Sequence, residues 1–359
     1  MALTDKLSAI AESIRNKTGS TDKMTLDEMA TNINNIKSGD ISAFINSDNV
    51  VTGGNTYDGY FYLKCIKKLP TVDIPNEVTN MAYAFANLQS ITEIPNLDVS
   101  KCTRYEYAFY NCISLLKVPK LNYANVQYTQ NMFYGCKSLT TEAINAMNLP
   151  KLKDCGYMFY GCTSMTEIPA IDISEIDYNG NGNTSNIFGN SGLIVADLSN
   201  MKMPSYSQYK QHYSSNWFYH CQNLIEIKNW NTNYLVNADY MFQEVPKLKK
   251  LCSLDFSNVI NVRSVMPNSG APALEDFGGF INLGKAYTTS SSSNDYNYKL
   301  DMSKEINLTH ESLMNVINGL YDIASAGVAT QQLVLGSTNL AKLTEDEIAI
   351  ATTKGWSVS

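Results

Sequence analysis

The sequence predicts an α/β repeat fold, in which a solenoid of short strands follows a pair of N-terminal helices and ends in a C-terminal α/β cap. The first observation is a phrase, "NMFYGCKSL" at 131–139, that returns as "YMFYGCTSM" at 157–165. The second is that its phenylalanine recurs at steps from 24 residues (Phe85 to Phe109) to 30 residues (Phe188 to Phe218). The third is that one unit has too few apolar residues to form a core alone, so the units must stack.

Residues 1–40 predict two helices separated by the polar break "KTGSTDK". Thr25 and Glu28 form a capping-box pattern at the start of the second helix. The apolar stripes have helical spacing; they consist of Leu7, Ile10, Ala11 and Ile14 in the first helix and Leu26, Met29, Ile33 and Ile36 in the second. A pair this small buries both stripes poorly. We therefore expect it to dock on a partner or on copies of itself, the alternative being a simple cap on the solenoid.

Residues 41–285 predict the repeat array. The recurring aromatic positions are Phe85, Phe109, Phe133, Phe159, Phe188, Phe218 and Phe242, with Met266 as a degenerate eighth member and Phe61 as a candidate first one. A short apolar alternation follows each phenylalanine, for example Ile91 and Ile94. A period of about 20–29 residues with one short strand per unit is typical of a leucine-rich-repeat solenoid.

The cysteines follow the same period. Cys112, Cys136, Cys162 and Cys221 each lie three residues after a repeat phenylalanine. The sequence has no CxxC pair and no Cys/His cluster with metal-ligand spacing. A free cysteine is small and commonly buried. We therefore expect a ladder of buried thiols, and neither a metal site nor a cofactor.

Residues 286–359 predict the capping repeats. Thr309 is the expected N-cap of a helix, and "LVLG" at 333–336 reads as a strand. Thr344 and Glu347 form a second capping box, whose helix ends near "KGW". The polar run "TTSSSSND" at 288–295 is expected to be a loop between array and cap.

Composition excludes several partner classes. The net charge is −7, whereas a nucleic-acid partner requires a basic stripe. A membrane-spanning helix needs a run of about 18 apolar residues, and the sequence contains no such run. The first residues, "MALTDKLSAIAESIR", lack the apolar stretch of a secretion signal. We expect synthesis in the cytoplasm, no nucleic-acid partner and no membrane insertion.

The sequence signals for a catalytic or metal-binding site are weak. Asp177, Asn179 and Asn181 start like a calcium loop, but the twelfth position is Phe188 and not the required glutamate. The three histidines are far apart in sequence, and Glu275 and Asp276 are expected to face opposite sides of a strand. No nucleophile has a base beside it, so we expect no enzymatic activity.

The candidate ligand-binding residues are four tyrosines that each follow a repeat phenylalanine: Tyr110, Tyr134, Tyr160 and Tyr219. Stacked units would align them on one face as an aromatic ladder. Such a ladder could bind sugar rings or a protein, because tyrosine offers a large contact area at a low entropy cost. The alternative is packing that only stiffens the solenoid. A second candidate surface consists of strand positions of mixed charge, namely Thr92, Lys117, Thr166, Glu226 and Lys249.

The motifs "YAFYNCISLLKVP" and "YMFYGCTSMTEIP" resemble the BspA-type leucine-rich repeats over about residues 55–285. The unit "NIFGNSGLIVADL" and the unit "YMFQEVPKL" depart from that pattern by lacking the cysteine. The resemblance implies a surface adhesin or interaction protein without common catalytic residues. The segment "LTDKLSAIAESIRNKTG" resembles an N-terminal module of bacteriophage and prophage tail proteins, and the C-terminal part resembles the ends of such proteins.

These features together favour a tail or baseplate protein of a phage or phage-like particle, made in the host cytoplasm, that binds a glycan or protein receptor on the bacterial surface. Other tail proteins, or copies of the chain in a trimer, would bind the N-terminal helices. The alternatives are a structural or decoration protein without receptor contact, a bacterial adhesin, and a tail-borne glycan hydrolase.

Overall fold

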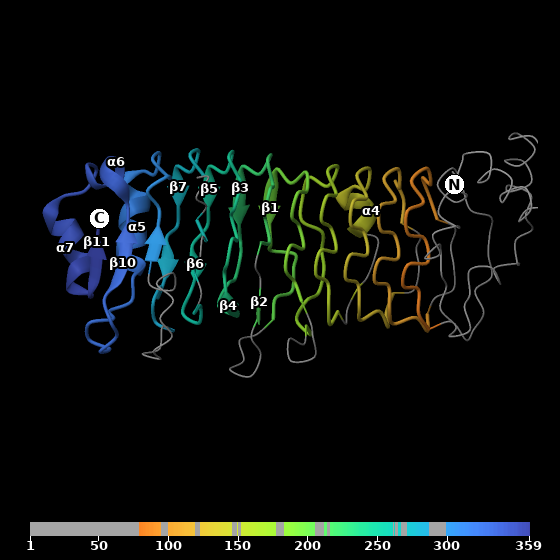
Figure 1. Cartoon of the computed structure of the whole chain (residues 1–359), viewed down its shortest axis with the longest axis horizontal. Helices are drawn as coiled ribbons and strands as arrows, with labels where there is room; N and C mark the ends of the chain where they lie inside the picture. The colour runs from red at the N-terminus through yellow and green to blue at the C-terminus, as the bar shows by residue number, and fades with distance from the viewer. Residues whose placement is uncertain are drawn as a thin grey trace, which may run out of the picture.

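The computed structural model describes residues 79–359, except for 95–99, 119–122, 146–148, 150–151, 177–182, 205–211, 214–215, 261, 263–264, 267–270 and 287–298. The described coils stack side by side along one long axis, with the C-terminal cap at one end (Figure 1). The helices expected over residues 1–40, the start of the calcium-like loop at 177–182 and the run at 288–295 lie outside the described residues. No helix of the described chain is long and apolar enough to cross a membrane.

Neighbouring coils pair through three parallel ladders, where the sequence predicts one strand per unit. The first ladder precedes the phenylalanine; it links Asn80, Arg104, Tyr128 and Asp154 in turn and continues as β2 (His212–Tyr213) and β4 (Leu235–Asn237). The second ladder follows it; it contains the bridge between Glu93 and Lys117 and the sheet of β1 (Val195–Asp197), β3 (Glu226–Lys228), β5 (Lys250–Leu251) and β7 (Asp276–Phe277). The third contains the bridge between Asp172 and Lys202, β6 (Leu254–Asp255) and β8 (Phe280–Ile281).

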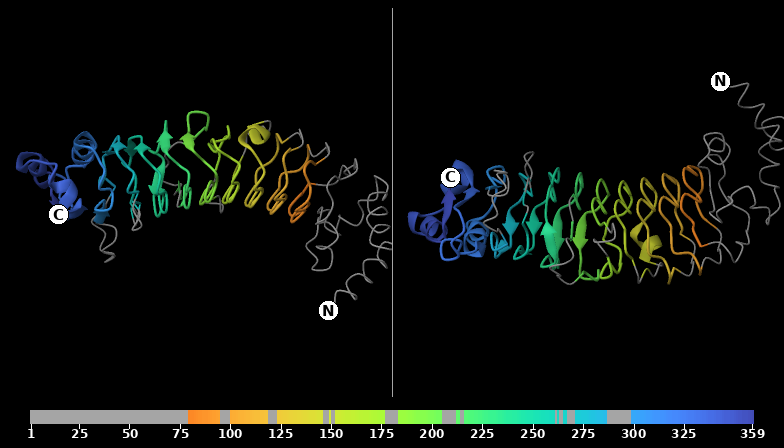
Figure 2. Two further views of the ribbon diagram at one scale, coloured as in Figure 1. Left: turned by 90° about the horizontal axis from the view of Figure 1, so that it is seen from above. Right: turned by 60° about the horizontal axis from the view of Figure 1, so that its bottom comes forward.

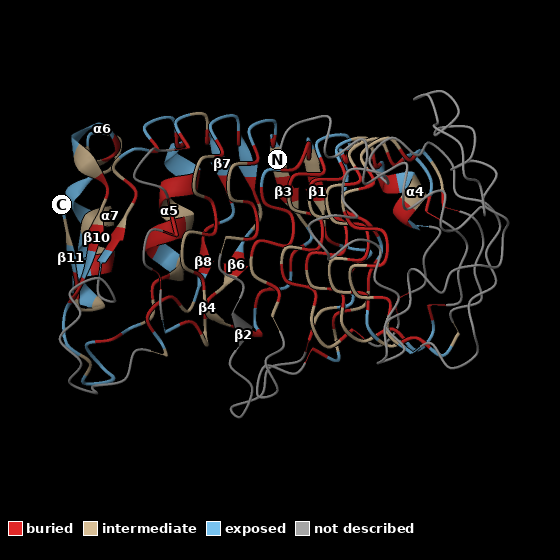
Figure 3. Ribbon diagram, turned by 45° about the vertical axis from the view of Figure 1, so that its right-hand side comes forward, coloured by how far each residue is buried: buried red, intermediate tan, exposed pale blue. Residues whose placement is uncertain are grey.

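One coil departs from this pattern. After Phe133 the chain forms α4 (Thr141–Asn145), with Thr141 and Ile144 buried against the stack. The short helix occupies the place along the coil where the neighbouring coils continue the second ladder (Figure 3).

The core is a stack of phenylalanine rings, as the repeat predicts. Successive rings from Phe85 to Phe242 lie nearly parallel, with centroids 5.2 to 6.4 Å apart. The rings from Phe109 onward are fully buried, and the leucine-like residues after them are buried as well. Each ring therefore shields two neighbours, so the core is continuous along the axis and no coil has a core of its own.

The buried thiol ladder is confirmed, and its chemistry is more specific than burial alone. Cys112 Sγ donates to the carbonyl of Phe85 in the preceding coil at 3.0 Å, and Cys136, Cys162 and Cys221 repeat the contact at 3.0 to 3.2 Å. All four are free thiols. Burial raises the pKa of Cys112 to about 12 and that of Cys221 to about 11. The thiols therefore stay protonated and act as donors between coils.

The turn that carries each phenylalanine has an unusual backbone. Residues two before and two after the phenylalanine have positive φ, as at Tyr107 (58°) and Asn111 (56°) around Phe109. Asparagine and glycine tolerate this region better than other residues, which explains Asn131 and Gly135 in the next coil. The turn lets alternate amides point along the axis, so that Phe85 N–H donates to the Ala108 carbonyl at 2.8 Å.

The cap has larger strand–helix units, as expected. Strands β9 (Lys299–Asp301), β10 (Gln331–Val334) and β11 (Trp356–Val358) form a parallel sheet, and the helices are α5 (His310–Gly319), α6 (Gly336–Leu340) and α7 (Glu345–Thr353). The predicted N-cap at Thr309 and the capping box of Thr344 with Glu347 are both present. Figure 2 shows these helices closing one end of the stack.

Candidate ligand-binding face

The turns around the phenylalanines display tyrosines along one ridge of the solenoid. Because the phenylalanine side chain points into the core, the residue after it points outward: Tyr110, Tyr134 and Tyr160 are half-buried, whereas the rings beside them in sequence are fully buried. The residue two before the phenylalanine lies on the same turn. Together these positions form the surface called here the tyrosine row, made of Tyr83, Tyr107, Tyr110, Tyr134, Tyr157 and Tyr160.

The rings of the tyrosine row contact one another in an unbroken series. Tyr83 and Tyr107 stack at 4.6 Å, and the ring of Tyr107 meets that of Tyr110 at 5.5 Å. Tyr110 then stacks on Tyr134 at 5.0 Å, and Tyr134 stacks on Tyr160 at 4.9 Å. Tyr157 joins at 5.8 Å from Tyr160. The predicted alignment of Tyr110, Tyr134 and Tyr160 is thus present.

Tyr219 does not extend this stack, which corrects the expected four-membered ladder. The intervening coil has Gly189 at the equivalent position, and the Tyr160 ring lies over it, because a Cβ there would be 2.7 Å from that ring. Among the described aromatic contacts, Tyr219 pairs edge-on with His220 at 4.0 Å. His220 lies in the turn with a φ of 58°, and its Nδ1 is 2.9 Å from Glu244.

The sequence analysis missed Tyr83, Tyr107 and Tyr157. These residues stand two before the phenylalanine in "YAF", "YAF" and "YMF", so the repeat alignment contained the signal. It was overlooked because a tyrosine with positive φ is uncommon, and nothing in one unit shows that this backbone brings two positions of a turn onto one ridge.

Two phenols of the row have raised pKa values. Burial, followed by the neighbouring phenols of Tyr110 and Tyr157, raises the pKa of Tyr134 above its usual range. Burial, followed by the phenol of Tyr134, raises the pKa of Tyr160 in the same way. The hydroxyls of Tyr134 and Tyr160 therefore keep their protons at ordinary pH, and a phenol can both donate and accept a hydrogen bond.

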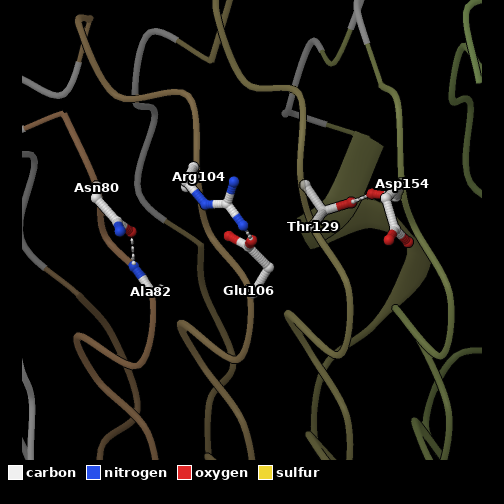
Figure 4. A network of polar contacts seen from close by, with 6 residues as sticks. All are labelled: Asn80, Ala82, Arg104, Glu106, Thr129 and Asp154. Atoms are coloured by element: carbon white, nitrogen blue, oxygen red, sulfur yellow. Dashed lines mark hydrogen bonds and ion pairs between the residues drawn. The ribbon is translucent and has the colours of Figure 1, made fainter. Parts of the chain in front are cut away.

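A polar network at the first ladder leads into these turns (Figure 4). Asn80 Oδ1 accepts from the Ala82 amide at 2.8 Å, and Arg104 pairs with Glu106. Thr129 Oγ1 donates to the Asp154 carbonyl at 3.0 Å.

Burial raises the pKa of Asp154 to about 6, the amide of Gly156 opposes the shift, and Glu106 adds to it. Asp154 Oδ1 accepts from that Gly156 amide at 3.1 Å, just as Asn80 accepts from Ala82. These side chains therefore hold the chain at the start of the turn and are engaged in structural contacts.

The chain matches the family described as "Mycoplasma protein of unknown function, DUF285" over residues 66–171 and again over 164–275. These matches span more than half of the sequence. The chain belongs to the DUF285 family. Its period, its stacked coils and its Phe–Cys–Leu register make this DUF285 protein a leucine-rich-repeat protein of the BspA type, as the motifs predict.

A solved structure of a leucine-rich repeat protein from Bacteroides ovatus is similar to 81% of this chain and 91% of its own chain, with 12% sequence identity and a TM-score of 0.25. The comparison with curated proteins found no match.

The second candidate surface of the DUF285 chain has no concentrated charge. Thr92, Lys117, Thr166 and Lys249 are exposed and Glu226 is half-buried. Lys249 of this surface pairs with Glu275 at 3.6 Å. Nowhere in the described chain do three or more His, Cys, Asp or Glu side chains gather as metal ligands would.

Glu275 and Asp276 are both exposed, which corrects the expectation of opposite faces. The amides of both residues donate to the same Lys249 carbonyl at 3.0 Å, just as the amides of Lys249 and Lys250 donate to the Ile225 carbonyl in the preceding coil, so the alternation of a regular strand is lost.

Proposed function

We propose that this DUF285 protein is a binding protein that holds a receptor on the bacterial surface through the tyrosine row. The observation that carries the proposal is the continuous contact of six half-buried tyrosines across successive coils of the array. Tyrosine combines a large apolar area with a polar tip and few rotatable bonds, which suits a recognition surface.

We further propose that the protein is a component of a phage or phage-like tail, made in the host cytoplasm and released in the particle. The support is the resemblance of residues 1–40 to tail-protein modules, whose apolar stripes would dock on other tail or baseplate proteins or trimerise. Peptide mass spectrometry of particles purified after prophage induction tests this placement. Presence of the chain only in a cell-envelope fraction would favour a bacterial adhesin.

Binding is tested with fluorescent full-length protein on a panel of bacterial cells. A variant with Tyr110, Tyr134 and Tyr160 changed to Ala should lose most binding, whereas Tyr321→Ala, a half-buried tyrosine in the cap, should keep it. Released sugars during the incubation would indicate a hydrolase instead of a binding protein.

A structural or decoration role is the second candidate, and the ring-on-ring stacking favours it because stacking also stiffens the array. Absence of cell binding by the wild-type protein across the panel, with loss of stability in the triple variant, would support that role and contradict the receptor proposal.

A further inference from the structure

The tyrosine row offers hydroxyls and ring edges, because its inner ring faces are already covered. Tyr83 and Tyr107 stack at 4.6 Å with 5° between their planes, and Tyr134 and Tyr160 stack at 4.9 Å with 13°. A ligand ring cannot insert between rings this close together. Tyr160, at the end of the stack, lies over Gly189 with its other side. The row therefore differs from an open aromatic platform on which sugars stack.

The hydroxyls follow a regular spacing along the solenoid axis. Tyr110, Tyr134 and Tyr160 occupy the same position in three successive coils, and their centroids are 5.0 and 4.9 Å apart. This is close to the roughly 4.8 Å separation of paired strands that sets the coil repeat. These three positions thus give one hydroxyl per coil at a regular spacing along the axis, which matches an extended polymer better than a compact ligand.

The position that flanks these hydroxyls is uncharged in five successive coils. The flanking position, two after the phenylalanine, is occupied by Asn87, Asn111, Gly135, Gly161 and Asn190. Asn111 Nδ2 donates to Asn87 Oδ1 at 3.4 Å, so this flank adds amide donors and acceptors beside the hydroxyls. No Asp, Glu, Lys or Arg occupies a tyrosine position or this flank between Tyr83 and Glu244.

We infer that the tyrosine row binds a linear, uncharged polysaccharide that lies along the solenoid axis, with the hydroxyls of Tyr110, Tyr134 and Tyr160 each bonding one sugar unit. The inference rests on the proposed binding function and specifies its ligand. An anionic polymer would find no cation in these rows. A neutral chain of hydroxyl groups can exchange donor and acceptor roles with each phenol.

The test uses Tyr→Phe changes, which remove the hydroxyl and keep the stacked ring. The variant carries Tyr110→Phe, Tyr134→Phe and Tyr160→Phe in the full-length chain, and Tyr321→Phe is the matched control. The probe is neutral polysaccharide released from cells that bind the wild-type protein, separated by chain length. We expect wild-type affinity to rise with chain length and the triple variant to lose about tenfold or more, since each hydrogen bond contributes about 0.5–1.5 kcal/mol. Its melting temperature should stay close to that of the wild type.

Three results would overturn the inference: unchanged affinity in the triple variant, no dependence on chain length, or cell binding that is abolished by protease treatment of the cells. The last of these identifies a protein receptor and leaves the proposed binding function intact. Absence of wild-type binding to any cells contradicts the proposed function itself, so the two failures are distinguishable.

Discussion

The repeat array and the C-terminal cap are built on the same parallel stacking but are held together differently. A coil of the array, such as the one described at 100–118, is stabilised by contacts to the coils before and after it: the phenylalanine stack, the thiol-to-carbonyl bonds and the axial amides. The cap contains α5 and α7, whose first turns are satisfied within the same segment by Thr309 and Thr344.

The two regions differ in whether their hydrogen bonds form within one segment or between coils. A helix closes its hydrogen bonds within about four residues, so its signals are readable from one segment. A coil of the array closes them with a partner some 24 residues away, as between Phe85 and Ala108 (23 residues apart). The array therefore depends on its neighbours in a way that the helices of the cap do not.

The largest expected effect comes from removing one ring of the stack. Phe133→Ala should lower the free energy of unfolding by about 3–5 kcal/mol, because the ring is fully buried between Phe109 and Phe159. Urea unfolding measures the loss, and hydrogen exchange should show weaker protection in both adjacent coils. Phe133→Leu should cost less. Loosening confined to one coil would contradict the shared core.

The junction between array and cap should respond to pH through Glu305. Its side chain is fully buried, its Oε1 accepts from the Ala271 amide at 3.1 Å, and burial raises its pKa from 4.5 to about 7. The native state therefore binds this proton more tightly than the unfolded state. Its contribution to stability is present below pH 4.5 and is lost as pH rises to about 7, by about 3 kcal/mol in total.

Glu305→Gln removes this titration and can still accept the Ala271 bond. Denaturant unfolding between pH 4 and pH 8 should show that the variant becomes more stable than the wild type as pH rises. Other titrating groups, including nearby Asp301, are common to both proteins, so the difference between the two curves isolates Glu305. Parallel curves would contradict the prediction.

A smaller effect is expected from a helix cap in the terminal region. Thr344 Oγ1 accepts a hydrogen bond from the Glu347 amide, and Glu347 Oε2 accepts one from the Thr344 amide at 2.8 Å. Thr344→Ala should therefore cost about 1 kcal/mol. Hydrogen exchange should show weaker protection in α7 and not in the array, because the hydrogen bonds of this helix cap form within one segment. Thr352→Ala, an exposed threonine near the other end of α7, is the control. Equal losses in distant coils would remove the distinction between the two regions.

The smallest expected effect concerns the turns of the array, where a substitution should raise the stability of the protein and not lower it. Glu244 has a φ of 58°, which a glycine adopts without strain. Glu244→Gly should stabilise the protein by up to about 1 kcal/mol, since the exposed pair with His220 contributes little. The same change at the strand position Glu226 should destabilise it. Thermal unfolding of both variants checks the pair, and a loss at Glu244 would disprove strain at this turn.

Particular residues show how far sequence reasoning extends. The helix caps at Thr309 and Thr344 were predictable because a cap acts within one segment. The strand predicted at 333–336 lies instead at Gln331–Val334, and Gly336 begins α6. Cys136 was predictable as buried from its repeat position, but its bond to the Phe109 carbonyl was not. The second position of the tyrosine row, at Tyr107 and Tyr157, was missed because its placement depends on a positive φ.

The sequence by itself determined the period, the phenylalanine stack, the thiol register and the capped helices, because each follows from which residue types recur at which spacing. Only the tertiary structure decided that three ladders join the coils, that Gly189 ends the tyrosine stack and that the stacked faces leave hydroxyls for recognition. The physical reason is that ring contacts and axial hydrogen bonds form between coils, so their geometry is a property of neighbouring units together and not of any one unit.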